Sequence, residues 1–155
     1  MKSLIAVCLM MLSSTLLAGE HNRFSLVTQP KWQSECASCH MAYPPQLLTA
    51  ENWRQMMKSL DRHFGTNATL DAQENAEILA FLERNAAQDQ RYGVKTLRIS
   101  DTPWFQRKHR EVQGATWAHA KVKSRANCTA CHVTAERGDW SEHSVRMPDG
   151  QRWER

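Results

Sequence analysis

The sequence predicts a mainly α-helical protein, and three observations support that fold class. Alanine, leucine, glutamate and glutamine are abundant, and glycine supplies only 6 of the 155 residues, a composition that favours helices. Apolar residues recur at offsets of three and four, as they do on one face of a helix. No segment alternates apolar and polar residues over the length of a convincing strand. We therefore expect short helices that pack as two small lobes.

Residues 1–18 are predicted to be a cleaved signal peptide. The segment has Lys2 near its start, continues through an apolar run from Leu4 to Leu17, and reaches the small residue Ala18. A helix needs about 20 apolar residues to span a bilayer, and this run is shorter. An uncleaved N-terminal anchor is the alternative. We expect export to the periplasm, with Cys8 removed together with the signal.

Two copies of the pattern C-x-x-C-H follow this signal. They consist of Cys36, Cys39 and His40, and of Cys128, Cys131 and His132. The pattern is that of covalent c-type haem attachment. On a helix these three side chains share a face, so the thiols reach the haem vinyl groups while the imidazole reaches the iron. The sequence therefore predicts a small two-lobed c-type cytochrome, with helices packed around two covalently attached haem c groups. We expect a short helix to carry the first motif.

Other uses of paired cysteines fit the sequence less well. One C-x-x-C pair suits a thioredoxin-like dithiol, two pairs suit a zinc site, and four cysteines in an exported protein suit two disulfides. None of these uses explains why a histidine directly follows the second cysteine of each pair. The zinc site nevertheless stays open as an alternative at this point.

Helix start signals occur at three places. Thr49 is a candidate N-cap, Asp71 opens a capping box with Glu74, and Thr102 precedes a proline in the first helical turn. Each start is followed by apolar residues that we expect to be buried: Trp53, Met56, Met57 and Leu60, then Ile78, Leu79 and Leu82, then Trp104 and Phe105.

The helical pattern ends near residues 88–93, and we place the lobe boundary there. The N-terminal haem lobe is predicted to cover residues 19–90 and the C-terminal haem lobe residues 91–155. The polar segment from Gly138 to Arg155 is expected to be poorly ordered or wrapped over the surface.

His40 and His132 leave one axial position on each iron for histidine, methionine, water or substrate. His63 is the first candidate, because it continues the apolar face of the helix that starts at Thr49. His109 is the second, because aromatic residues precede it by one turn and neighbouring basic residues suit haem propionates. We expect His63 to pair with His40 and His109 with His132, although crossed ligation is geometrically possible.

Four further residues are weaker candidates for the open axial positions. His119 is the rival of His109, since it stands shortly before the second motif. His21 and His143 are interpreted as surface residues, and Met147 is the free-standing methionine candidate.

Several segments outside the haem motifs resemble one known family, the small periplasmic dihaem cytochromes c. The resemblance runs from about Trp32 to Ala135 and includes ECASCHMAYPP at 35–45, Trp53, DRHFG at 61–65, TPWF at 102–105, KHRE at 108–111 and ANCTACH at 126–132. It implies a two-lobed electron-transfer protein with two histidine ligands on each iron, supplied in part by His63 and His109. It also implies two partners, an oxygen-binding monohaem cytochrome c and a membrane b-type cytochrome.

Electron transfer is the predicted function, because an iron closed by two histidines keeps its ligands on reduction and binds no substrate. We do not predict an enzyme. The alternatives are a haem enzyme, such as a peroxidase or small-oxyanion reductase, and a gas or redox sensor, each of which needs one exchangeable axial position.

The formal charge of +4 is modest and the basic residues are scattered, so nothing points to nucleic acid. We expect a monomer that makes transient contacts with redox proteins, including a membrane protein. A basic docking surface is predicted from Arg107, Lys108, Arg110, Lys121, Lys123 and Arg125.

Overall fold

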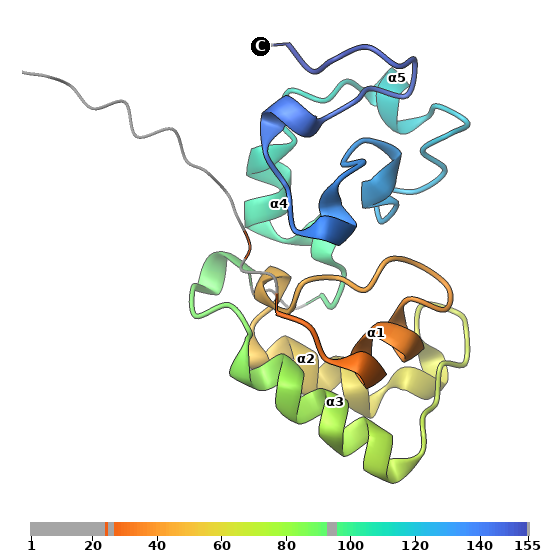
Figure 1. Ribbon diagram of the computed structural model, residues 1–155, viewed down its shortest axis with the longest axis vertical. Coiled ribbons are helices and arrows are strands. Elements are labelled where there is room, and N and C mark those ends of the chain that lie inside the picture. The colour runs from red at the N-terminus through yellow and green to blue at the C-terminus, as the bar shows by residue number, and fades with distance from the viewer. Residues whose placement is uncertain (1–23, 25–26, 93–95, 155) are drawn as a thin grey trace, which may run out of the picture.

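The computed structural model describes residue 24 and residues 27–92 and 96–154 (Figure 1). The predicted signal peptide, residues 1–18, lies outside these residues. Helices α1, α2 and α3 gather at one end of the molecule, and α4 and α5 lie at the other. The described residues form isolated bridges but no strand, so the prediction of a mainly helical fold is confirmed. None of the described helices has the length and apolar character needed to cross a bilayer.

The N-terminal lobe is built from α1 (Pro30–Cys36), α2 (Ala50–Lys58) and α3 (Ala72–Arg84). Thr49 caps α2 as predicted, because its hydroxyl accepts a hydrogen bond from the Asn52 amide at 3.3 Å. The three helices bury one apolar cluster, which contains Trp32, Leu48, Trp53, Met56, Met57, Ile78, Phe81, Leu82 and Ala86.

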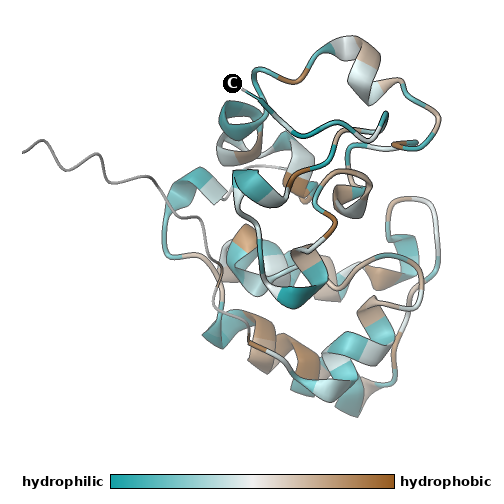
Figure 2. Cartoon of the chain, turned by 45° about the horizontal axis from the view of Figure 1, so that its top comes forward, coloured by the Kyte–Doolittle hydropathy of each residue, from teal (hydrophilic) through white to brown (hydrophobic). Residues whose placement is uncertain are grey.

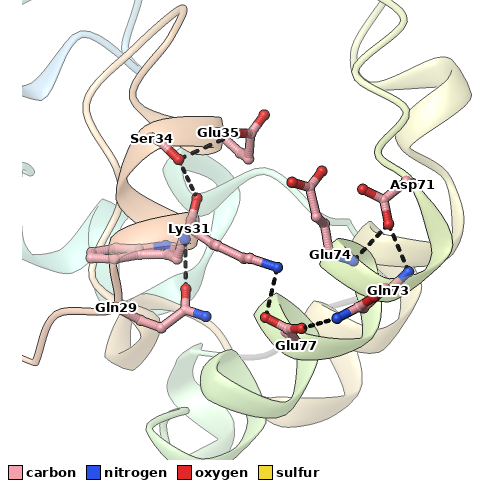
Figure 3. Close-up of polar contacts among 9 residues, drawn as sticks. Gln29, Lys31, Ser34, Glu35, Asp71, Gln73, Glu74 and Glu77 are labelled. Atoms are coloured by element: carbon pink, nitrogen blue, oxygen red, sulfur yellow. Dashed lines mark hydrogen bonds and ion pairs between the residues drawn. The ribbon is translucent and has the colours of Figure 1, made fainter.

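Contacts between α1 and α3 fix the helix that leads into the first haem motif (Figure 3). Lys31 Nζ lies 2.9 Å from the Glu77 carboxylate. The rings of Trp32 and Phe81 pack with their centroids 5.2 Å apart. Asp71 caps α3 as predicted, through two amides of the first turn at 2.8 and 3.0 Å. Because exposed ion pairs contribute little, the buried ring pair supplies most of the stabilisation between these helices.

The C-terminal lobe contains little regular structure. Helices α4 (Pro103–Lys108) and α5 (Gly114–Trp117) are short, and they are followed by three 3₁₀ turns, Cys128–Ala130, Ala135–Arg137 and Glu142–Ser144. In Figure 2 the N-terminal helices alternate between hydrophobic and hydrophilic bands, whereas much of the C-terminal lobe is loop. The boundary placed between residues 90 and 91 stays a prediction.

Aromatic side chains pack between the two ends of the molecule. Phe24 meets Trp104 and Trp140 edge-on, with ring centroids 5.8 and 5.5 Å apart. Met41, directly after the first haem motif, is buried in a cluster with Ala135 and Trp140 from the segment after the second motif. The segments that follow the two motifs therefore pack against each other in one apolar cluster.

Two local expectations are wrong. The first haem motif is not helical, because α1 ends at Cys36 and Ala37 caps it, so that His40 lies beyond the helix. Pro30 at the first helical position was the sequence signal for this earlier start. The C-terminal segment is not peripheral either, since the Trp140 side chain within it is only 9% exposed and belongs to an apolar cluster.

Candidate haem sites

The structure brings the four predicted histidines together as two pairs. The ring centroids of His40 and His63 are 6.1 Å apart, and those of His109 and His132 are 6.0 Å apart. Two imidazoles that bind one metal from opposite sides, each through a bond of about 2 Å, have ring centroids roughly 6 Å apart. Each pair is therefore spaced to hold one iron, and the spacing favours direct over crossed pairing.

Short turns position the first pair. His63 follows the 3₁₀ turn Leu60–Arg62, and its carbonyl accepts a hydrogen bond from the Thr66 amide at 3.0 Å. Gly65 adopts a φ of +98° within this turn, a conformation that favours glycine. His63 thus lies in a loop beyond α2 and not on the helix itself.

A helix end positions one histidine of the second pair. Thr102 caps α4 as predicted, accepting from the Phe105 amide at 3.2 Å. His109 is the C-cap of the same helix, and its amide donates to the Phe105 carbonyl at 3.0 Å. The Phe105 and His109 rings stack with centroids 4.0 Å apart and planes 20° apart. On the facing segment, the His132 amide donates to the Cys128 carbonyl at 2.8 Å, which closes a single helical turn around the second motif.

Backbone carbonyls select the tautomer of one histidine in each pair. Nδ1 of His40 lies 2.7 Å from the Met41 carbonyl oxygen, and Nδ1 of His109 lies 2.9 Å from the Phe105 carbonyl oxygen. A carbonyl oxygen only accepts, so Nδ1 carries the proton and Nε2 keeps its lone pair for a metal. Nδ1 of His63 is buried and has no hydrogen-bond partner among the described residues.

Both histidines of the second pair are half-buried. Burial, followed by the charge of the facing His109, lowers the pKa of His132 to about 4. Burial also lowers the pKa of His109, against the opposing effect of the Phe105 carbonyl. The thiol of Cys128 has its pKa raised to about 11, chiefly by burial. At neutral pH both imidazoles are therefore in the neutral form that binds metals.

A cavity of about 620 Å³ lies beside this pair. Its size falls within the range of roughly 300–1,000 Å³ that small-molecule and cofactor pockets occupy. Its lining includes apolar rings, both thiols of the second motif and both histidines: Phe105, His109, Trp117, Cys128, Cys131, His132, Trp140 and Val145. The indole Nε1 of Trp140 is buried without a hydrogen-bond partner among the described residues. The cavity thus has two thiols that could attach a haem, two imidazoles that could bind its iron, and an indole N–H without a partner among the described residues. This set of groups fits a haem.

The first pair is more open to water. His40 is exposed and His63 is half-buried. The Tyr43 ring covers one face of His40, with centroids 4.6 Å apart and planes 20° apart. Burial lowers the pKa of His63, and the charges of His40 and Arg98 add to this effect. Burial, followed by the charge of Glu35, raises the pKa of Cys36 to about 11.

The other ligand candidates lie elsewhere or at the margin. His119 is exposed, and its Nδ1 accepts a hydrogen bond from the Lys121 amide at 3.2 Å. His143 and Met147 line the cavity of the second pair, and His143 is exposed. His21 lies outside the described residues. Sequence reasoning missed Trp140, whose ring centroid is 5.2 Å from that of His132.

Comparison with known proteins identifies the family of the chain. The family model described as dihaem cytochrome c matches residues 32–140. The chain belongs to the dihaem cytochrome c family. As a member of this family it carries two covalently attached haem c groups, and the two C-x-x-C-H motifs are their predicted attachment points. Membership of this family also supports a role for the chain as a haem electron-transfer protein.

Solved structures of family members resemble the chain over most of its length. The diheme cytochrome c of Shewanella baltica OS155 is 40% identical, with a TM-score of 0.72 over 80% of this chain and 96% of the other. A diheme cytochrome c of Rhodobacter sphaeroides is 42% identical, with a TM-score of 0.68 over 74% of this chain and 98% of the other. DHC purified from the same organism is 43% identical, with a TM-score of 0.66 over the same shares. No curated protein matches the chain.

Proposed function

We propose that this chain is a periplasmic electron carrier in which His40 and His63 hold one iron and His132 and His109 hold the other. The observation that carries the proposal is the spacing of the ring pairs, 6.1 and 6.0 Å between centroids. In each pair one ring belongs to a haem-attachment motif and the other comes from a separate segment. Two ligands of fixed position leave no coordination site for a substrate, as suits a carrier.

The haems supply the one-electron couple of iron when they are bound. The residues of the chain keep the ligand set unchanged during that exchange. The carbonyls of Met41 and Phe105 orient the rings of His40 and His109 through Nδ1. Such second-shell bonds fix ring orientation and raise ligand basicity, so little has to move when an electron arrives or leaves.

Removal of the proposed distal ligands tests this function. His63→Ala and His109→Ala should each open one iron, because each variant removes the imidazole that is proposed to close it. Each variant should then show one high-spin haem that binds carbon monoxide when reduced, measured by optical and electron paramagnetic resonance (EPR) spectroscopy. His119→Ala is the matched control and should leave both haems low-spin. If the wild-type protein itself took up carbon monoxide at either haem, an enzyme or sensor would replace the carrier.

We also propose that redox partners dock beside the second site. Arg107 and Arg110 are exposed and line the same cavity as His109. Positive charge at a cavity mouth attracts an acidic patch and speeds association. Arg125, another residue of the predicted surface, lines the same cavity, and the Lys121 ammonium group donates to the Pro148 carbonyl at 2.9 Å and keeps its charge. The partners that suit this surface are a monohaem cytochrome c and a membrane b-type cytochrome, each met transiently by a monomer.

Salt dependence of electron exchange tests the docking surface. In the double variant Arg107→Gln and Arg110→Gln, exchange with a monohaem cytochrome c should be slower and less sensitive to ionic strength. Arg84→Gln, which changes an exposed arginine at the end of α3, is the control and should change neither quantity. A wild-type rate that is independent of salt would contradict electrostatic docking.

A further inference from the structure

One tyrosine lies between the two candidate haem sites. Tyr43 stacks on the His40 ring at a centroid distance of 4.6 Å and an interplanar angle of 20°. Its hydroxyl donates a hydrogen bond of 2.6 Å to the carbonyl oxygen of Ala126, which is 83 positions away in the sequence. The side chain therefore touches an axial ligand of the first site and the backbone of the loop that leads into the second haem motif.

The Ala126 carbonyl is itself part of the second motif's environment. The Cys128 amide donates to it at 3.0 Å, and Cys128 Sγ lies 3.6 Å from it. Cys128 is a haem-attachment residue, so the acceptor of the Tyr43 hydroxyl lies next to the covalent edge of the second site. A continuous series of contacts thus runs from His40 through Tyr43 and Ala126 to Cys128.

The Tyr43 ring also contributes to packing on both sides. It is half-buried against the cluster of Met41, Ala135 and Trp140 and against the cluster of Leu47, Trp104 and Phe105. A phenol keeps its proton at neutral pH, so the hydroxyl remains a donor. A side chain held at both its ring and its hydroxyl cannot shift toward one site without loosening its contact with the other.

We propose that Tyr43 is a positioning residue that fixes the His40 ring and the Ala126–Cys128 loop in one geometry. The inference rests on the proposed bis-histidine ligation. Coupling between separate sites is carried by packed side chains and hydrogen bonds with a defined arrangement. In this protein the stacked ring sets the plane of one axial imidazole, and the hydroxyl holds the loop of the other site.

Two variants separate these two contacts. Tyr43→Leu removes the ring, and the plane of the His40 imidazole is then no longer fixed. The g values of a low-spin ferric haem depend on the angle between its two imidazole planes, so one EPR signal should shift while the other stays in place. Tyr43→Phe keeps the ring and removes the hydroxyl. Both EPR signals should then stay unchanged, while backbone amide hydrogen exchange over residues 124–132 becomes faster.

Tyr92→Phe is the matched control, because Tyr92 stacks on Trp104 at 5.1 Å and not on a histidine. It should change neither the EPR signals nor exchange over residues 124–132. The role of Tyr43 is overturned if Tyr43→Leu leaves both signals in place, if Tyr43→Phe leaves exchange unchanged, or if the control gives the same changes. A high-spin signal from the wild-type protein would instead contradict the bis-histidine proposal. If Tyr43→Leu does not fold, Tyr43→Phe still decides the hydroxyl's part.

Discussion

The two histidine pairs have nearly equal spacing but different geometry and surroundings. The ring planes are 30° apart for His40 and His63, and 76° apart for His109 and His132. His40 is exposed, whereas the second pair lies beside a large cavity closed in part by Trp140. Both sites start from the same five-residue motif. Their difference therefore comes from the segments that supply the distal ligand and the covering side chains.

The two proposed distal ligands show how those segments differ. His63 lies in a turn that contains Gly65, while His109 ends helix α4 and is bonded twice to the carbonyl of Phe105. A ligand on a helix end is held by the packing of that helix, and a ligand in a turn is held by fewer contacts. We expect the second site to be the more rigid and the more protected of the two.

The largest expected effect comes from the ring that holds His109. Phe105 is 5% exposed, and Phe105→Ala should lower the free energy of unfolding by about 3–5 kcal/mol, the range for large core deletions. Gln106→Ala, the exposed neighbour on the same helix, should change it by less than about 0.5 kcal/mol. Guanidinium denaturation of the holoprotein measures both values. Equal effects of the two substitutions would remove the structural distinction claimed for the second site.

The second largest effect should be a difference between the two sites in their sensitivity to acid. The pKa of His132 falls from an unfolded value of 6.5 to about 4, so the unfolded chain takes up the proton first as pH falls. The stability linked to this group is present above about pH 6.5 and is lost as pH approaches about 4. In an EPR titration the enclosed second site should stay low-spin at a pH where the exposed first site has become high-spin. The reverse order would contradict the assignment of burial.

Reduction potentials should show the smallest of these effects. Ferric haem carries one more positive charge than ferrous haem, so burial and nearby cations raise the potential. The charge of Arg125 lowers the pKa of His109, and the charge of Arg98 lowers that of His63, which places one guanidinium near each site. Arg125→Gln should lower the potential of the second site and Arg98→Gln that of the first. A redox titration in which either variant shifted both potentials equally would show that the sites do not have separate electrostatic environments.

Local signals explain what was predictable from the sequence. The helix starts at Thr49, Asp71 and Thr102 were predicted because an N-cap bonds within its own first turn. The two haem motifs are likewise contained in five residues each. The association of His63 and His109 with these motifs came from apolar patterns and from a family resemblance, not from the motifs themselves.

Long-range contacts explain what was not predictable. The hydrogen bond from Tyr43 to Ala126 joins segments far apart in sequence, and nothing near either residue indicates it. Trp140 was assigned to a peripheral tail because its neighbours are polar, yet it packs against His132. A polar segment that supplies one buried ring has no periodicity to reveal it, so only the tertiary structure places that ring in the site.

An EPR spectrum of the oxidised wild-type protein tests the central claim most directly. Two histidines on each iron, with planes 30° apart at one site and 76° apart at the other, should give two low-spin signals of different shape, because the g values depend on that angle. The more nearly perpendicular pair should give the signal with the larger maximum g value. A high-spin signal would contradict bis-histidine ligation, and two identical low-spin signals would contradict the difference between the sites.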